Sequence, residues 1–599
     1  MTPAFLGVVF FSLLLKAGLA LLFGDLEPQY DERQFLRFAR EFTATGETAT
    51  LWRAPGYQWF MGLGLWLGGG HPVGIRLLQA LLSTGTAILV YRIGCREWGY
   101  RAGFWAGAFV AFYPTQVAFA HLLWAETAYT FFVLLAFERL LALDRSGGGR
   151  TVVPVALALL AASLMRSTGL VLLGVSVLWI LYRNRTARGL KWAAAIAAIA
   201  AVGVSAWSIP ASLRAGCLVV VDLNGPFNLW SGNSSEIPEG VPGLWGVGLP
   251  LETGFDPRVA GFLPDDAWRS GLPHRLAAAG IHERFGCDGS AWFQKQALAE
   301  ITSHPGAFLA RMPLKIATFW SPDFFLPRHL LRGWYGPLPL VVMGCLLVGV
   351  LVASVVPLVG GPMALAALGT SAFRSLALAW VAAYVVLHAV TFGVSRMHFP
   401  LVPILVLSVA GLLLADSAGR SPRTARRFLV RGLPWAVGIF AAWLWIAPLV
   451  MGLYVAPSPQ FAPVARVLGT LRHLPFGSTE YVAWNLASIE ASVGREAEAR
   501  RILEEEGVAG RPWSRYLHAR LSPAPDRGES ELRRSMEAGD DLFAAHVVLA
   551  QMSLDREDAD AAIADLERAL QRRPWDVELS RAIELLESHA ENTSPAPSK

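Results

Sequence analysis

The stretch "AFLGVVFFSLLLKAGLALLF" (residues 4–23) is apolar throughout except for Lys16. A run of this length can cross the hydrocarbon core of a bilayer. We interpret it as an uncleaved first membrane span, because the apolar run continues past the small residues Gly18 and Ala20. A cleaved signal peptide is the alternative. Similar runs recur along the chain, and this recurrence decides the fold.

The composition agrees with a membrane protein. Of the 599 residues, 54% are hydrophobic and only 16% are charged, whereas a soluble chain carries about 25% charged residues. The sequence therefore predicts an all-α polytopic membrane protein with about eleven transmembrane helices. The predicted spans are residues 4–23, 72–93, 102–120, 123–142, 152–165, 168–182, 192–210, 337–357, 375–394, 399–415 and 434–455. Residues 152–182 fit either a hairpin or one span. The net charge of +5 indicates a bias between loops and does not indicate a nucleic-acid surface.

Arginines gather in alternating short loops, which the positive-inside rule assigns to the cytoplasm. The N-terminus is then cytoplasmic, and the loops 24–71 and 211–336 lie outside together with everything after residue 456. The loop 211–336 is rich in Gly and Pro, and its length predicts a folded cap of mixed structure over a cavity at membrane level. Cys217 and Cys287 both fall in this loop. They would pair in an oxidising compartment, and two free thiols are the alternative.

The composition changes to that of a soluble helical domain over residues 457–599, which we predict as a second domain after the membrane domain 1–456. The stretch that begins at Leu542 matches the tetratricopeptide template at Leu549, Ala550, Ala562, Leu566, Ala569 and Pro574. An earlier stretch matches at Leu486, Ala487, Ala499 and Leu503. Small alanines let paired helices approach closely in such repeats. A protein partner for this domain is expected, but its identity does not follow from the fold.

Carboxylates stand at the predicted outer surface. "YDERQFLRFAREF" (residues 30–42) follows the first span and places phenylalanines on one face, which predicts a helix lying in the headgroup layer. At its start, Asp31 and Glu32 are candidate catalytic acids; Asp31 suits a general base, and a helix cap is the alternative. Glu126, in "HLLWAETAYT", stands at the lip of a span, where an acid is costly unless it faces a polar cavity. It would orient an acceptor, bind a metal or simply begin a helix.

Several cations lie at the same predicted level, and together they suggest an anionic ligand such as a lipid phosphate. The candidates are Lys16, Arg53, Arg76, Arg166, Arg396 and His398. For each of them the alternative is a side chain that reaches along the span to the membrane surface.

Blocks in this order resemble the GT-C glycosyltransferases, and most closely the bacterial branch related to protein O-mannosyltransferases and aminoarabinose lipid A transferases. The resemblance covers most of residues 1–415. The blocks include "YDERQFLRFA", "LWRAPGYQWFMG", "AFYPTQVAFAHLLWAET", "SLMRSTGLVLL", "CLVVVDLNGPFNLWSGNSSEIPEG" and "SRMHFPLVPILVLSVAGLL".

The resemblance implies a GT-C fold in a bacterial inner membrane, with the outer loops in the periplasm. It also implies an inverting transfer from a polyprenyl-phosphate sugar to a hydroxyl on a lipid, glycan or protein, with Asp31 as the base. Arg166 and Arg396 would hold the phosphate. Glu126 would orient the acceptor or, with Asp31, support a divalent cation such as Mg or Mn.

Two other classes of protein fit part of the sequence. A transporter or flippase of a lipid-linked or anionic substrate would also carry charged residues in its spans. However, no inverted hydropathy repeat is present, and the charges gather at one face. A membrane-anchored assembly protein would use the tetratricopeptide domain alone. A polymer ligase with a lipid-diphosphate donor is a further alternative among enzymes.

Overall fold

The computed structural model describes residues 1–24, 26, 28, 31–234, 279–281, 286–323, 325–331, 334–335, 338–415, 430, 432–443, 486–487, 490–491, 494–505, 515–537, 543–572 and 582–587. Every element within these ranges is a helix, which confirms the predicted all-α class. The described residues fall in two compact units, one with residues up to Ser234 and from Gly286 to Trp443, and one with the residues from Leu486 onward. The predicted boundary at 456/457 lies outside the described residues.

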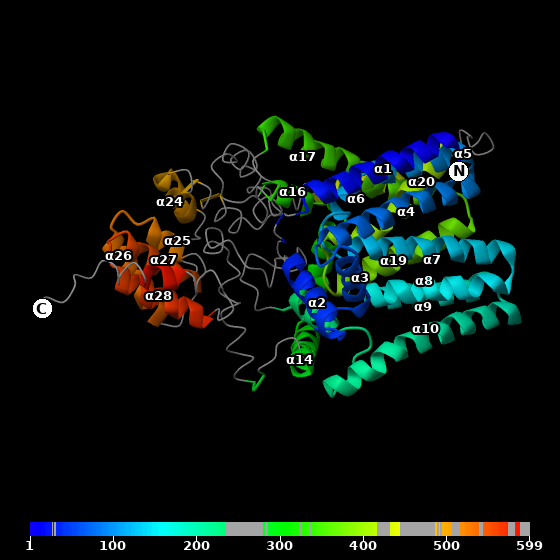
Figure 1. Cartoon of the computed structure of the whole chain (residues 1–599). Coiled ribbons are helices and arrows are strands. Elements are labelled where there is room, and N and C mark those ends of the chain that lie inside the picture. Colours follow the sequence, from blue (N-terminus) through cyan, green and yellow to red (C-terminus); the bar gives the residue numbers. More distant parts are fainter. Residues whose placement is uncertain are drawn as a thin grey trace, which may run out of the picture. The chain divides into compact units, whose positions relative to one another are not determined.

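The first unit is a bundle of helices (Figure 1). In chain order its elements are α1 (Pro3–Leu22), α2 (Asp31–Thr45), α3 (Pro55–Leu67), α4 (Val73–Trp98), α5 (Tyr100–Phe112), α6 (Pro114–Phe119), α7 (Glu126–Ser146), η1 (Gly149–Thr151), α8 (Val152–Met165), α9 (Gly169–Arg183), α10 (Ala187–Ala215), α11 (Asn224–Ser231), α14 (Cys287–Ser303), α15 (Pro305–Phe319), α16 (Phe325–Leu331), α17 (Leu340–Val355), the π-helical turn η3 (Val356–Gly360), α18 (Gly361–Ala367), α19 (Ala372–Val390), the 3-10 helix η4 (Ser395–Leu401) and α20 (Val402–Leu414).

Six of these runs are long and apolar enough to cross a membrane, and this makes the chain a multi-pass membrane protein. They are Pro3–Leu22, Val73–Trp98, Ala187–Ala215, Val341–Ala367, Ala372–Val390 and Ser395–Leu414. Shorter apolar helices, among them α8 and α9, lie beside them. The total of eleven spans and the cytoplasmic side of the N-terminus stay predictions.

Helix α4 lies inside the bundle, where it packs on α1, α3, α5, α7 and α20. Its closest neighbour is α5, which follows after Gly99 in a left-handed conformation, with φ of 93°. The two helices meet at Gly94 and Gly103: a Cβ on Gly94 would lie 2.6 Å from Gly103 Cα. Small residues allow helix backbones in a bilayer to approach this closely.

Residues 152–182 form two helices and not one. The chain turns between α8 and α9 at Arg166, whose N–H donates to the Ala162 carbonyl at 3.0 Å. A Cβ on Gly169 would lie 2.5 Å from Ser163 N, so the turn requires glycine there. This tight turn places Arg166 at an end of the bundle.

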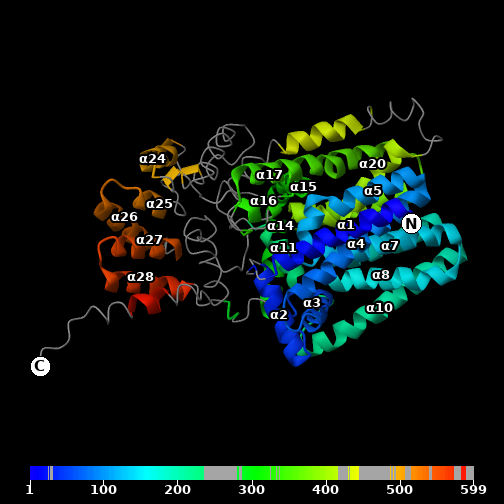
Figure 2. The same ribbon diagram turned by 45° about the horizontal axis from the view of Figure 1, so that its top comes forward.

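Helix α2 forms where we predicted a helix, but its apolar face packs on protein. Figures 1 and 2 show α2, α14 and α16 at the end of the bundle away from the N-terminus. Phe35 and Phe38 are buried, and the Phe35 ring meets Tyr57 of α3 edge to face at 5.1 Å. The contact with α3 fixes the helix that begins with Asp31.

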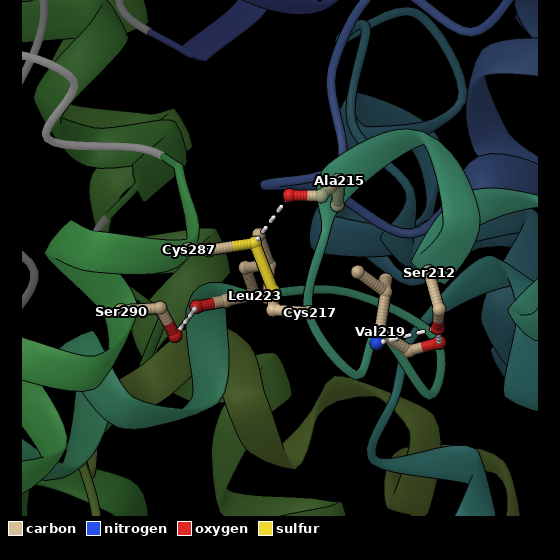
Figure 3. The surroundings of a disulfide bond; sticks show 7 residues. All are labelled: Ser212, Ala215, Cys217, Val219, Leu223, Cys287 and Ser290. Carbon is tan, nitrogen blue, oxygen red and sulfur yellow. Dashed lines mark hydrogen bonds between the residues drawn. A yellow bond between two sulfur atoms is a disulfide. The ribbon is translucent and has the colours of Figure 1, made fainter.

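Cys217 and Cys287 form a disulfide with an S–S distance of 2.01 Å, which resolves the two alternatives left open by the sequence (Figure 3). The bond ties the chain just after α10 to the start of α14. The Ser290 hydroxyl donates to the Leu223 carbonyl at 3.1 Å, and Val219 N–H donates to the Ser212 hydroxyl at 2.9 Å. The segment 217–223 is therefore held from both sides. Within the predicted cap, residues 235–278 lie outside the described part of the chain.

The second unit contains α24 (Glu496–Glu505), α25 (Arg515–Arg520), α26 (Pro525–Glu537), α27 (Phe543–Leu554) and α28 (Ala559–Arg572). Helices α27 and α28 pack against each other around a buried cluster that includes Ala550, Ala562, Leu566 and Ala569. These are positions at which the tetratricopeptide template places small or apolar side chains. Pro574 lies outside the described residues. The repeat assignment and a protein partner for this unit stay predictions.

Candidate active site

Two helices of the first unit begin with an acidic residue. Asp31 opens α2 and Glu126 opens α7, so each carboxylate stands in a first turn, where the helix dipole favours negative charge. The Glu126 side chain is 4% exposed and that of Asp31 is 17% exposed. Both acids are therefore largely removed from water, where charged partners become necessary.

Arg396 joins the two acids. Its Nη1 donates to Asp31 Oδ2 at 2.9 Å, and its Nε lies 3.7 Å from Glu126 Oε1. The guanidinium carbon is 5.3 Å from the ring centroids of both Trp124 and Phe325. These rings shield the arginine from water, and cation–π contact favours its position. Residues more than 250 positions apart in the sequence thus meet around one guanidinium.

Each acid also has a second arginine. Arg166 Nη1 donates to Glu126 Oε1 at 2.5 Å, and its Nη2 lies 3.1 Å from Met397 Sδ. Arg53 Nη2 lies 3.6 Å from Asp31 Oδ1, while its guanidinium donates to Gln34 Oε1 at 3.0 and 3.2 Å. The structure therefore brings together five of the predicted site residues.

Asp222 is a further carboxylate of this site, and the sequence analysis did not single it out. It lies in the segment held by the disulfide, and its Oδ1 accepts from Asn224 N at 3.2 Å. Burial raises the pKa of Asp222, while the Ser167 hydroxyl and the charges of Arg53 and Arg166 act in the opposite direction. Asp222 is thus close enough to Arg53 and Arg166 for their charges to act on it. Asp222 lies in "CLVVVDLNGPF", part of one of the sequence blocks given above, but no neighbouring residue in that block marks it as a site residue.

Arg76 is fully buried and serves the backbone that carries the acids. Its Nη1 donates to the carbonyls of Phe23 and Gly24 at 2.7 and 2.6 Å, and its Nε donates to the His121 carbonyl at 3.0 Å. Gln79, one turn further along α4, donates to the Leu122 carbonyl at 2.7 Å. These contacts join the end of α1 to the turn before Glu126. Arg76 thus positions the backbone of the site, and its predicted role in phosphate binding stays a prediction.

Three other predicted residues have different surroundings. Glu32 is fully buried and its Oε1 accepts from Leu123 N at 2.6 Å, so it braces α2 against the turn before Glu126. Lys16 is buried within α1 and donates to the Ser12 hydroxyl at 3.0 Å, one turn earlier. His398 Nδ1 lies 2.5 Å from the Phe319 carbonyl. These contacts hold the three residues within the fold, and their predicted catalytic and phosphate-binding roles stay predictions.

A divalent cation does not fit the described donor set. Within the described ranges, no group of three or more His, Cys, Asp or Glu side chains could hold a metal ion. Arg396 also lies between Asp31 and Glu126, the two acids predicted as metal ligands.

Comparison with known proteins finds similarity only among solved structures. No protein-family model and no curated protein matches the sequence. ArnT from Cupriavidus metallidurans bound to undecaprenyl phosphate is 15% identical, with a TM-score of 0.40 over 87% of this chain and 80% of that chain. Its apo structure is 16% identical, with a TM-score of 0.41 over 86% of this chain and 80% of that chain.

The archaeal oligosaccharyltransferase AglB from Archaeoglobus fulgidus, in complex with an inhibitory peptide and a dolichol-phosphate, is 12% identical, with a TM-score of 0.37 over 88% of this chain and 72% of that chain. ArnT and AglB are membrane glycosyltransferases of the GT-C superfamily, the group that the sequence blocks resemble. At these scores the likeness is too loose to assign an activity.

Proposed function

We propose that the chain is a membrane glycosyltransferase that moves a sugar from a polyprenyl-phosphate carrier to a hydroxyl group at the outer side of the membrane. The observation that carries the proposal is the contact of Arg396 with both Asp31 and Glu126 at one end of a membrane bundle. A guanidinium binds phosphate oxygens as well as carboxylates. The same site therefore offers a base for a hydroxyl and a cation for a phosphate leaving group.

Asp31 takes the proton in this mechanism. The acceptor oxygen attacks the anomeric carbon as its hydroxyl proton passes to an Asp31 carboxylate oxygen. The bond from the anomeric carbon to the phosphate oxygen breaks on the opposite side, so the configuration inverts and polyprenyl phosphate leaves. Asp31 must be charged to act as a base, and guanidinium groups at 2.9 and 3.6 Å favour its charged form.

The arginines stabilise the charge that develops on the leaving phosphate. Arg53, Arg166 and Arg396 lie around the two acids, with side chains only 15–21% exposed. Charges fixed in a site that excludes water are worth more to a transition state than the same charges in water. When the phosphate binds, it competes with Asp31 and Glu126 for these guanidinium groups, so donor binding loosens Asp31 for its role as base. Glu126 holds Arg166 and Arg396 and orients the acceptor.

The direct test is transfer by the purified protein. Incubation with a panel of labelled polyprenyl-phosphate sugars, followed by mass measurement of the products, should reveal one sugar moved to an added or co-purified acceptor. Arg166→Ala should weaken binding of the donor, measured with a lipid phosphate that carries no sugar. The matched control is Arg150→Ala, which removes an exposed arginine of η1 outside the site. Transport of the unmodified lipid across vesicles without any transfer would contradict the proposal.

A further inference from the structure

An apolar groove of about 530 Å³ lies between α5, α20 and the π-helical turn η3. Its walls include Trp105, Phe109 and Phe112 from α5, Val356 from η3, and Val409 and Leu413 from α20. Trp105, Phe112 and Leu413 are 58%, 43% and 55% exposed, so the groove opens on the outer face of the bundle. In a bilayer this face meets lipid.

The groove coincides with an irregular turn in a membrane span. Residues 340–367 form one helical run that η3 interrupts with a π-turn starting at Val356. Just beyond it, the backbone approaches α20 closely: a Cβ on Gly361 would lie 2.6 Å from Leu405 Cβ. A π-turn within an α-helix often marks a functional position. Here it contributes one wall of the groove.

One cation stands at the end of the α5 face that lines the groove. Arg101 precedes Trp105 by four residues, so it lies on the same face and about 6 Å nearer the helix start. Arg101 is exposed, and no ion pair within the described ranges involves it. A cation in the first turn of a helix opposes the helix dipole, so Arg101 does not serve the stability of α5.

We propose that the groove binds one acyl chain of an anionic phospholipid whose phosphate contacts Arg101. Apolar walls favour hydrocarbon, and the exposed Arg101 at one end favours an anion there. In a membrane the hydrocarbon contact distinguishes one lipid poorly from another, because every lipid offers similar chains. Selectivity therefore comes from the charge and is modest, with an expected preference of about fivefold for an anionic over a zwitterionic headgroup.

Native mass spectrometry of the full chain tests this site. The detergent-purified protein would be titrated with phosphatidylglycerol or phosphatidylcholine of the same acyl chains. We expect phosphatidylglycerol to occupy one site about five times more tightly. Arg101→Gln should abolish this preference, whereas Arg150→Gln, at an exposed arginine outside the groove, should retain it. Equal preference in Arg101→Gln and the unchanged chain would overturn the proposal.

Three further measurements identify the molecule that binds in the groove. Ala108→Leu narrows the groove, so it should weaken binding of both phospholipids while the melting temperature stays close to that of the unchanged chain. Glycerol phosphate, which has the headgroup charge without the chain, should not bind. Displacement of phosphatidylglycerol from this site by a polyprenyl phosphate at equal concentration would overturn the assignment to a phospholipid.

Discussion

Helix α7 carries two buried glutamates, one in its first turn and one near its middle, and the surroundings of the two differ. Glu126, in the first turn, meets Arg166 and Arg396. Glu138, about three turns later, is 1% exposed and meets Arg92, Arg96 and Arg139. Both are carboxylates removed from water and paired with more than one arginine. Burial and ion pairing alone therefore do not distinguish a site from a structural cluster.

The partners make the distinction. Around Glu138 the arginines come from α7 itself and from its neighbour α4, and their side chains are 28–45% exposed. Around Glu126 the arginines come from the α8–α9 turn and from η4, and their side chains are only 15–21% exposed. Arg396 also meets Asp31. A set of alternating charges assembled from remote segments and shielded from water is costly to build. Such an arrangement is expected where it serves a ligand, while the Glu138 cluster serves the helices.

The largest expected effect comes from Asp31→Asn. The amide keeps the size of the side chain but cannot take a proton, so we expect transfer to fall by about 100-fold or more. Donor affinity should change by less than about threefold, because the arginines remain. Initial rates with labelled donor and a donor-binding isotherm measure the two quantities. Retention of more than a few per cent of the activity would make Asp31 a helix-start residue only and would erase the contrast between the two clusters.

Glu138→Gln is the matched change at the second buried glutamate of α7. It removes the shared partner of three arginines, and we expect the free energy of unfolding to fall by about 1–2 kcal/mol, since these arginines are partly exposed. Thermal unfolding in detergent measures the loss. The transfer rate below the melting temperature should not change. A large loss of transfer in this variant with an unchanged melting temperature would place function at Glu138 and not at Glu126.

The sequence predicted much of this arrangement because hydropathy and spacing carry it. Run lengths located the helices, and the positions of Asp31 and Glu126 beside apolar runs marked them as unusual. The sequence did not predict the role of Arg76, because a buried arginine meets a phosphate or backbone carbonyls according to how distant turns close around it. The contact between Lys16 and Ser12 was easier to predict from the sequence, since residues four apart on a helix are neighbours.

Asp222→Asn sharpens the comparison from within the site. The charge of Asp222 competes with the donor phosphate for Arg53 and Arg166, so removal of this charge should lower KM for the donor about 3- to 10-fold, with less change in kcat. Because burial raises the pKa of Asp222, protonation at acid pH should tighten donor binding in the unchanged chain. Asp222→Asn already lacks the charge and should lose this pH dependence. The same rise in donor affinity with acid in both proteins would exclude Asp222 as its cause.

Substitution of Lys315 should have the smallest effect on stability. Unlike the arginines beside Glu126 and Glu138, this buried cation has hydrogen bonds to an amide and a carbonyl. It lies in α15, outside the six long apolar helices, and its Nζ donates to Asn233 Oδ1 at 2.7 Å and to the Val390 carbonyl at 3.3 Å. Burial, and then the charge of Arg311, lowers its pKa to about 7. Above this pH the folded chain leaves Lys315 neutral, whereas the unfolded chain still binds the proton up to the ordinary lysine pKa.

Stability should therefore rise with pH above about 7, by at most ~1.4 kcal/mol per pH unit. Lys315→Met should flatten that slope, while Lys295→Met, at an exposed lysine of α14, should keep it. Melting temperatures from pH 7 to pH 9 measure the slope for all three proteins. An equal rise in the unchanged chain and in Lys315→Met would mean that Lys315 stays charged in the fold. Lys315 would then keep its charge although no carboxylate among the described residues lies beside it. In that case acidic partners would not be needed to keep a buried side chain charged, and the acids beside the arginines around Asp31 would lose this explanation.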